Sequence, residues 1–156
     1  ISVMNERQVG GEPVADLHVK SAPLKGINIP EQYVPLAIDE FPAIFIAAAC
    51  AEGETVLTGA EELRVKESDR IQVMADGLKV LGIDIEPTQD GAIIRGGKLG
   101  QGTVISHGDH RIAMSFAMAA LRAQGEITIE DCANVNTSFP GFVDLAASAG
   151  LSISQR

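Results

Sequence analysis

Residues 61 to 70, EELRVKESDR, bring acidic and basic side chains together in a chain that is otherwise largely apolar. Lys66 and Arg70 flank Glu67 just before a run whose apolar spacing predicts a helix. The unpaired N–H groups and the positive dipole end of a helix start attract anions, and nearby lysine and arginine side chains strengthen that attraction. The segment therefore predicts a binding site for a phosphate or a carboxylate.

Two other polar groups also stand directly before predicted helices. They are IDE at residues 38–40 and GDHR at residues 108–111. If the helix starts converge, their N–H groups and cationic side chains form one positively charged pocket, even in a protein of acidic net charge. We therefore treat the three groups together as one candidate site.

Ordinary structural roles account for several of these residues when each is taken alone. Asp39, Ser68 and Asp109 are of the residue types that commonly cap helix N-termini. Glu67 and Arg70, three residues apart, fit a surface ion pair that contributes only about a few tenths of a kcal/mol. A cap needs one short polar side chain, however, so the additional lysine, arginine and histidine residues favour a binding site.

Composition limits the classes of function. The 156-residue chain is 46% hydrophobic and 21% charged, which is typical of a globular domain with its own core. Its formal net charge of -9 argues against nucleic acid and anionic membranes as partners, because both require a basic face. The sequence contains no glycine-rich phosphate loop and no metal-ligand spacing, so we predict no cofactor and no metal.

The cysteines and the apolar runs indicate in which cellular compartment the protein is expected. Cys50 falls in an alanine-rich run that predicts a buried helix, and Cys132 falls in a polar loop. These settings predict no disulfide and favour the cytoplasm. No apolar run is long enough to cross a bilayer. The chain opens at Ile1 inside an alternating strand pattern, so we expect a fragment of a longer polypeptide.

The elements that must position the polar groups alternate between strands and helices. Residues 1–22 predict a hairpin with a Gly-Gly turn. A helix apolar on every side is predicted at 41–51, a strand at 54–59, and a second helix at 71–81 that stops at Gly82. Two further strands complete this part of the chain.

The same order of elements recurs about 70 residues later, when Gly53-Glu54 is matched to Gly125-Glu126. In both copies a second helix ends at a glycine, and another strand follows. We read residues 36–97 and 103–156 as two modules, and residues 1–30 as the closing hairpin of an earlier one. Since the first helix of each module is apolar all round, we expect an α/β fold with helices inside and sheets outside.

The strings IDEFP, ELRVKESDRI, GDHRIAMSFAMAAL and TSFPGF, in this order, closely resemble the C-terminal part of the EPSP synthase (3-phosphoshikimate 1-carboxyvinyltransferase) family. The likeness covers nearly the whole chain. It implies the enolpyruvyl transferase fold, an inside-out α/β barrel of repeated βαβαββ modules, of which this chain holds about two of the three modules of one domain.

The resemblance implies transfer of the enolpyruvyl group of phosphoenolpyruvate to the 5-hydroxyl of shikimate 3-phosphate, with release of phosphate, in aromatic amino-acid biosynthesis. It makes Asp39 the base near the attacking hydroxyl and a shikimate-phosphate contact. It makes Glu67 the proton donor to the methylene carbon. Lys66 would lie on the shikimate-phosphate side, whereas Arg70 and Arg111 would hold phosphoenolpyruvate.

His110 would lie beside the reacting centre. Some members of the family carry a lysine where Thr137 stands here, so that basic contact is absent or supplied elsewhere. The family's cleft lies between two domains, so the N-terminal domain is an expected partner and the isolated chain is expected to lack turnover. Two alternatives stay open: a UDP-N-acetylglucosamine enolpyruvyl transferase, and a non-catalytic anion-binding module with the same fold.

Overall fold

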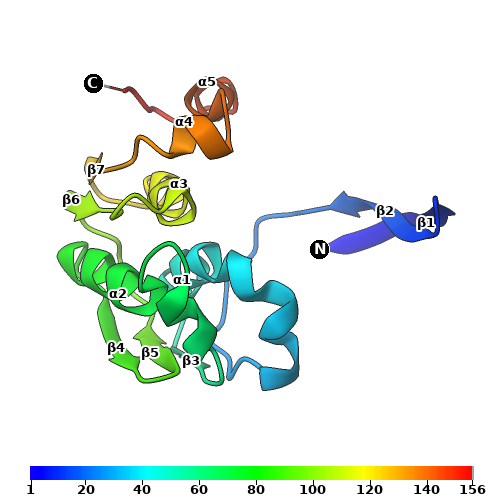
Figure 1. The fold of residues 1–156 in the computed structure, drawn as a ribbon, viewed down its shortest axis with the longest axis horizontal. Coiled ribbons are helices and arrows are strands. Elements are labelled where there is room, and N and C mark those ends of the chain that lie inside the picture. Colours follow the sequence, from blue (N-terminus) through cyan, green and yellow to red (C-terminus); the bar gives the residue numbers. More distant parts are fainter. Residues whose placement is uncertain (156) are drawn as a thin grey trace.

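The computed structural model describes residues 1–155, and its first element is a hairpin that stands apart from the rest of the chain (Figure 1). Strand β1, Ser2–Val9, pairs antiparallel with strand β2, Glu12–His18. Gly10 and Gly11 form the turn with φ of 61° and 90°, a region that glycine enters without strain. The predicted hairpin is confirmed, and its side chains are exposed or only partly buried.

A proline-containing connector leads from the hairpin to the first buried helix. Two short 3-10 helices, η1, Glu31–Tyr33, and η2, Pro35–Glu40, run directly into helix α1, Phe41–Ala49. Pro42 lies in the first turn of α1, where its missing N–H costs no intrahelical hydrogen bond. The helix predicted at 41–51 is confirmed, with an earlier end.

Three antiparallel strands form the main sheet, in the order β3-β5-β4. Their bounds are β3, Glu54–Leu57; β4, Asp84–Thr88; and β5, Gly91–Arg95. Ala92 and Ile94 of β5 are buried, whereas Arg95 reaches the other face and pairs with Glu54 and Asp84. The sheet therefore has one face in the core and one charged face in solvent.

Helices α1 and α2 lie against the inner face of this sheet (Figure 1). Helix α2, Arg70–Val80, follows the 3-10 helix η3, Glu61–Val65. The apolar residues that recur at helical spacing in α2 are fully buried: Ile71, Met74 and Leu78. Gly82, with φ of 83°, lies just beyond the helix end. The predicted second helix of the first module is confirmed.

A parallel strand pair joined through a helix follows. The elements are β6, Gly102–Ile105; α3, His110–Ala119; and β7, Ile127–Glu130. Strands β6 and β7 pair in parallel, with α3 in the connection between them. Residues 25–29 likewise bond in parallel to residues 52–56, with α1 in the intervening connection. A strand–helix–strand arrangement therefore occurs twice.

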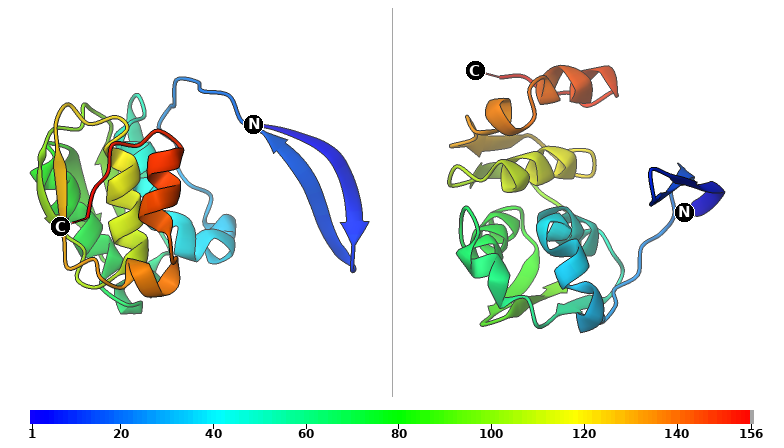
Figure 2. Two further views of the ribbon diagram at one scale, coloured as in Figure 1. Left: turned by 90° about the horizontal axis from the view of Figure 1, so that it is seen from above. Right: turned by 45° about the vertical axis from the view of Figure 1, so that its right-hand side comes forward.

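Two short helices complete the chain, α4, Val135–Ser138, and α5, Phe142–Ser148 (Figure 2). The strand predicted after Gly150 is wrong, because residues 151–155 form no strand. Leu151 is held instead by side-chain packing, in a small apolar cluster with residues of α3 and α5.

Helix α3 packs on α1 and α2, so one apolar cluster joins these three helices to the sheet. At Gly77 the helices α2 and α3 approach closely, since a Cβ there would lie 2.3 Å from the buried ring of Phe116. In the described part of the chain, Ala43 and Ala47 leave one face of α1 exposed, so the enclosure of this helix stays a prediction. Within residues 1–155, no helix combines the length and the apolar character needed to span a membrane.

Candidate active site

The start of helix α2 is fixed by Asp69. Its Oδ1 accepts a hydrogen bond from the backbone N–H of Gln72 at 3.0 Å, so Asp69 is the N-cap. The capping role considered for Ser68 is therefore wrong. The Ser68 hydroxyl donates instead to Oδ2 of Asp109 at 3.1 Å, across to the start of α3.

Asp109 caps helix α3, as the ordinary interpretation of this residue predicts. Its Oδ1 accepts from the backbone N–H groups of Arg111 and Ile112 at 3.0 and 3.4 Å. Helix α1 differs, because Glu40 at its N-cap position makes no side-chain capping hydrogen bond. Asp39 is therefore not a cap, and its carboxylate is available for other contacts.

Arg70 lies at the centre of the polar cluster although its side chain is only 1% exposed. Its nitrogens donate to three carboxylates: Nε to Asp109 at 2.8 Å, Nη1 to Asp39 at 3.0 Å, and Nη2 to Glu67 at 2.6 Å. Burial opposes the charged form, but the hydrogen bond to Asp109 and the other carboxylates outweigh it and raise the pKa of Arg70. The cation is therefore permanent.

Asp109 is the fixed partner in this cluster. Its side chain is 0% exposed, and both of its oxygens are engaged. One oxygen caps α3, and the other accepts from Arg70 and Ser68. A buried ion pair with this many hydrogen bonds locks the first turn of α2 to the first turn of α3.

Asp39 faces three cations that come from different parts of the chain. Its carboxylate lies 3.0 Å from Arg70 Nη1, 3.8 Å from Arg111 Nη2 and 3.9 Å from Lys66 Nζ. The hydrogen bond from Arg70 lowers the pKa of Asp39 below its ordinary value of 3.8, against partial desolvation and with help from the other two charges. The side chain is 45% exposed, so an ionised carboxylate is open to ligands here.

Lys66 and Glu67 occupy the loop between η3 and α2. Lys66 pairs with Glu62, four residues earlier, and its ammonium group also faces Asp39. Glu67 is half-exposed, and its recorded side-chain contact is with Arg70. A half-exposed carboxylate held by one partner can turn toward a bound ligand, which a fully buried one cannot do.

Arg111 joins the cluster from α3, whereas the predicted site residue His110 and Thr137, the position where some family members carry a lysine, do not bond to it among the described residues. Arg111 Nη1 donates to the backbone carbonyl of Asp39 at 3.2 Å and to Glu40 Oε1 at 3.4 Å. His110 is partly buried, and within residues 1–155 its side chain makes no recorded hydrogen bond or ion pair. Thr137 is exposed on α4, with no recorded side-chain contact to the cluster.

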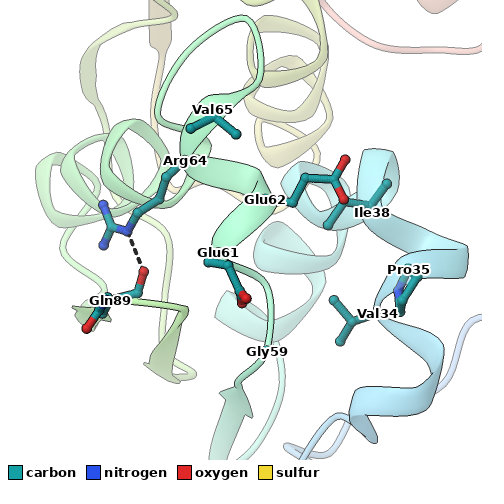
Figure 3. A pocket seen from close by; sticks show the side chains of 9 residues that line it. All are labelled: Val34, Pro35, Ile38, Gly59, Glu61, Glu62, Arg64, Val65 and Gln89. Carbon is teal, nitrogen blue, oxygen red and sulfur yellow. Dashed lines mark hydrogen bonds between the residues drawn. The ribbon is translucent and has the colours of Figure 1, made fainter.

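A pocket of about 510 Å³ lies on the flank of this cluster, between η2 and η3 (Figure 3). Its lining residues are Val34, Pro35, Ile38, Gly59, Glu61, Glu62, Arg64, Val65 and Gln89. Its floor is mostly apolar, and none of the predicted site residues lines it. In the part of the chain that the structure describes, no three His, Cys, Asp or Glu side chains are placed to hold a metal ion.

The sequence of the chain also matches the model of a known protein family. The model of EPSP synthase (3-phosphoshikimate 1-carboxyvinyltransferase) matches residues 1–145, which is nearly the whole chain. The chain belongs to the EPSP synthase family. The UDP-amino-sugar alternative is not favoured, because the family description and the relatives reported below name the shikimate enzyme.

Two relatives with this name are similar over almost the whole chain. The 3-phosphoshikimate 1-carboxyvinyltransferase of Alkalilimnicola ehrlichii is 70% identical over 156 residues, covering 99% of this chain and 35% of the relative. That of Nitrosococcus oceani is 69% identical over 153 residues, covering 98% of this chain and 34% of the relative. The chain spans about a third of the length of these members of the EPSP synthase family.

Solved structures of the family show the same fold. The chain matches a structure of EPSP synthase from Acinetobacter baumannii with a TM-score of 0.93 and 64% identity, covering 98% of this chain and 36% of that chain. The mixed helix and strand architecture is therefore the one found in EPSP synthase structures.

Sequence reasoning missed the role of Asp109 in this EPSP synthase family member. The sequence analysis treats it only as a candidate cap, but it also binds the side chain of Arg70. The available signal was the position of Asp109 directly before His110 and Arg111, inside a polar group already considered part of the site. Its complete burial depends on how α2 and α3 pack, and the spacing of residues carries no such information.

Proposed function

We propose that this chain forms one side of the active site of an enzyme that transfers the enolpyruvyl group of phosphoenolpyruvate to the 5-hydroxyl of shikimate 3-phosphate. Membership of the EPSP synthase family supports the reaction. One observation supports the site: an ionised, half-exposed carboxylate, Asp39, faces Arg70, Arg111 and Lys66. Two anionic substrates require such cations, and the transfer requires carboxylates among them.

The reaction explains why carboxylates and cations share one site. The hydroxyl oxygen bonds to C2 of phosphoenolpyruvate while the methylene carbon gains a proton; phosphate and a proton then leave, and the double bond returns. We assign the proton on the methylene carbon to Glu67 and acceptance of the hydroxyl proton to Asp39. Nearby carboxylates also stabilise the positive charge that develops at C2 when the methylene carbon is protonated.

The cations bind the substrates. We assign Lys66 to the shikimate-phosphate side, and Arg70 and Arg111 to phosphoenolpyruvate, with His110 beside the reacting carbon. Each nitrogen of Arg70 donates to one of the protein's own carboxylates and the side chain is only 1% exposed, so a substrate anion reaches it most directly when one of these carboxylates moves aside. Glu67 and Asp39 are the partners that can move, because both are about half-exposed while Asp109 is fully buried.

The proposal extends to the architecture. We infer an inside-out α/β barrel in which residues 36–97 and 103–156 are two βαβαββ-type modules and residues 1–30 close an earlier one. The repeated parallel strand–helix–strand arrangement supports two repeated units, but it gives residues 25–29 the same place as β6, at the start of a unit rather than in the earlier one. The other side of the cleft, including the N-terminal domain, would come from the further two-thirds of the length of the relatives. We propose the cytoplasm as the location and no metal or organic cofactor.

A chimaera tests this proposal. The 156 residues would replace the matching third of the Alkalilimnicola ehrlichii relative, and phosphate release would be measured with phosphoenolpyruvate plus shikimate 3-phosphate. We expect turnover, and we expect E67Q to reduce kcat by roughly 10²- to 10⁴-fold while substrate binding survives.

The matched control is E61Q, which makes the same change on the same loop outside the charged cluster. A folded chimaera that binds both substrates without turnover would indicate the non-catalytic binding module instead. Turnover with UDP-N-acetylglucosamine in place of shikimate 3-phosphate would indicate the related transferase.

A further inference from the structure

Arg64 is a charged residue of the 61–70 segment to which the proposed mechanism gives no role. It lies on η3, and its side chain points toward Gln89 in the turn between β4 and β5 (Figure 3). Its Nε donates to the carbonyl of Gln89 at 2.7 Å, and its Nη2 donates to the carbonyl of Thr88. A guanidinium that binds two successive backbone carbonyls is held in one orientation.

The third nitrogen of Arg64 reaches the start of helix α2. Its Nη1 donates to Oδ2 of Asp69 at 2.6 Å, and Oδ1 of the same carboxylate caps α2 at Gln72. Asp69 therefore connects Arg64 to the helix whose first residue is Arg70. Through this one side chain, the β4–β5 turn is tied to the helix start that carries the central cation of the site.

The β4–β5 turn also binds the first residues of the 59–69 segment. Asp90 Oδ2 accepts from the backbone N–H of Gly59 at 2.8 Å, and its carbonyl accepts from Ala60 N–H at 2.7 Å. The hydrogen bond from Gly59 lowers the pKa of Asp90, which agrees with a carboxylate engaged in its charged form. The first residues of the 59–69 segment are therefore bonded to Asp90, and Arg64 connects Asp69 at its other end to the carbonyls of residues 88 and 89.

The part of the 59–69 segment between these contacts has no regular secondary structure beyond η3. Leu63 is the buried residue of η3, and Val65 is 80% exposed. Beyond η3 the backbone of Lys66 is extended, and residues 66 to 69 form bends rather than a helix or strand. The positions of Lys66 and Glu67 relative to Arg70 thus depend on their side-chain contacts with Glu62 and Arg70 and on how the two ends of the segment are held.

We infer that Arg64 is a positioning residue, which places Lys66 and Glu67 against the start of α2 by joining Asp69 to the Thr88–Gln89 carbonyls. An ordinary surface ion pair contributes little to stability and affects no other residue. The three simultaneous partners of Arg64, two of them backbone groups on another hairpin, distinguish it from such a pair. The expected effect of Arg64 on turnover rests on the proposed function, whereas its expected effect on the structure of the loop does not.

The structural part is tested on the 156-residue chain itself by hydrogen–deuterium exchange. In R64M we expect faster amide exchange at residues 62–70, while exchange in β5 and α3 and the thermal unfolding midpoint change little. The control is R95M, which removes an arginine from the outer face of the same sheet, where it pairs with side chains only. Unchanged exchange at residues 62–70 in R64M would overturn the inference.

The functional part uses the chimaera described above. We expect R64M to lower kcat by up to roughly 10²-fold, the order expected when catalytic groups move by about 1 Å, while R95M keeps normal turnover. D69N combined with R64M should cost little more than R64M alone, since both changes break one connection. An inactive unmutated chimaera would count against the proposed function only, whereas normal kcat in R64M would overturn the positioning role.

Discussion

Nε of Arg70 donates to Oδ2 of Asp109 over 2.8 Å, and both side chains are almost completely withdrawn from solvent. Removing Asp109 deprives Arg70 of its one fully buried partner, leaving only the half-exposed Asp39 and Glu67, and it also removes the cap of α3. We therefore expect D109A to lower the free energy of unfolding by about 3–5 kcal/mol, measured by urea denaturation of the 156-residue chain.

The matched control for D109A is D84A, because Asp84 also pairs with an arginine but is 69% exposed. We expect D84A to change stability by less than about 1 kcal/mol. Equal effects of the two substitutions would show that the buried pair contributes no more than an exposed one.

The lowered pKa of Asp39 predicts a pH dependence of stability. Because the carboxylate is favoured more in the folded state than in the unfolded state, its contribution is present above pH 3.8, the ordinary value, and is lost as pH falls through the lowered pKa. We expect an NMR titration of the Asp39 carboxyl carbon to give a midpoint below 3.8. In R70M the midpoint should move upward, since the hydrogen bond from Arg70 is the largest lowering cause. A midpoint at or above 3.8 in the unmutated chain would contradict the geometry around Asp39.

The close approach of α2 and α3 at Gly77 predicts that a single methyl group destabilises the chain. Alanine is the better helix former by about 1 kcal/mol, but its Cβ would meet the ring of Phe116 at 2.3 Å. Overpacking of this kind costs about 1–3 kcal/mol, so we expect a net loss of up to about 2 kcal/mol for G77A. G97A is the control, because a Cβ there meets only Ile83 Cδ1 at 3.5 Å. A G77A chain as stable as the unmutated one would mean that the two helices separate at little cost.

The exposed hairpin predicts that the first strands contribute little to the stability of the remaining chain. Strands β1 and β2 pair with each other and carry no fully buried residue. We expect deletion of residues 1–18 to change the free energy of unfolding by less than about 0.5 kcal/mol, measured by the same denaturation. A much larger loss would reveal packing between the hairpin and the helical body.

The sequence predicted the positions of helices and strands better than the way they pack in space. The hairpin, α1 and α2 could be placed within a few residues because glycines, Pro42 and the spacing of apolar residues act locally. The strand predicted after Gly150 is absent, and the enclosure of α1 stays a prediction because Ala43 and Ala47 are exposed within residues 1–155. Both depend on what lies beside the segment in space, and local spacing contains no such information.

The candidate site was predicted in part for the same reason. The three polar groups do meet, and Asp39, Glu67 and Arg70 are in direct contact. The burial of Asp109 and the side of the loop to which Arg64 turns could not be derived, since both follow from tertiary packing. The roles of the predicted residues in catalysis stay predictions.

The sequence positions of the carboxylates around Arg70 also have a consequence for the order in which the chain folds. Asp39 and Asp109 lie 31 and 39 residues away from it in sequence, so local structure alone cannot bring them together. A chain that has formed its helices but not docked α3 onto α2 would leave this arginine without its buried partner. The ionic cluster can therefore assemble only late, once these distant segments have closed on one another. Its formation would be a marker of the completed tertiary structure rather than of any early intermediate.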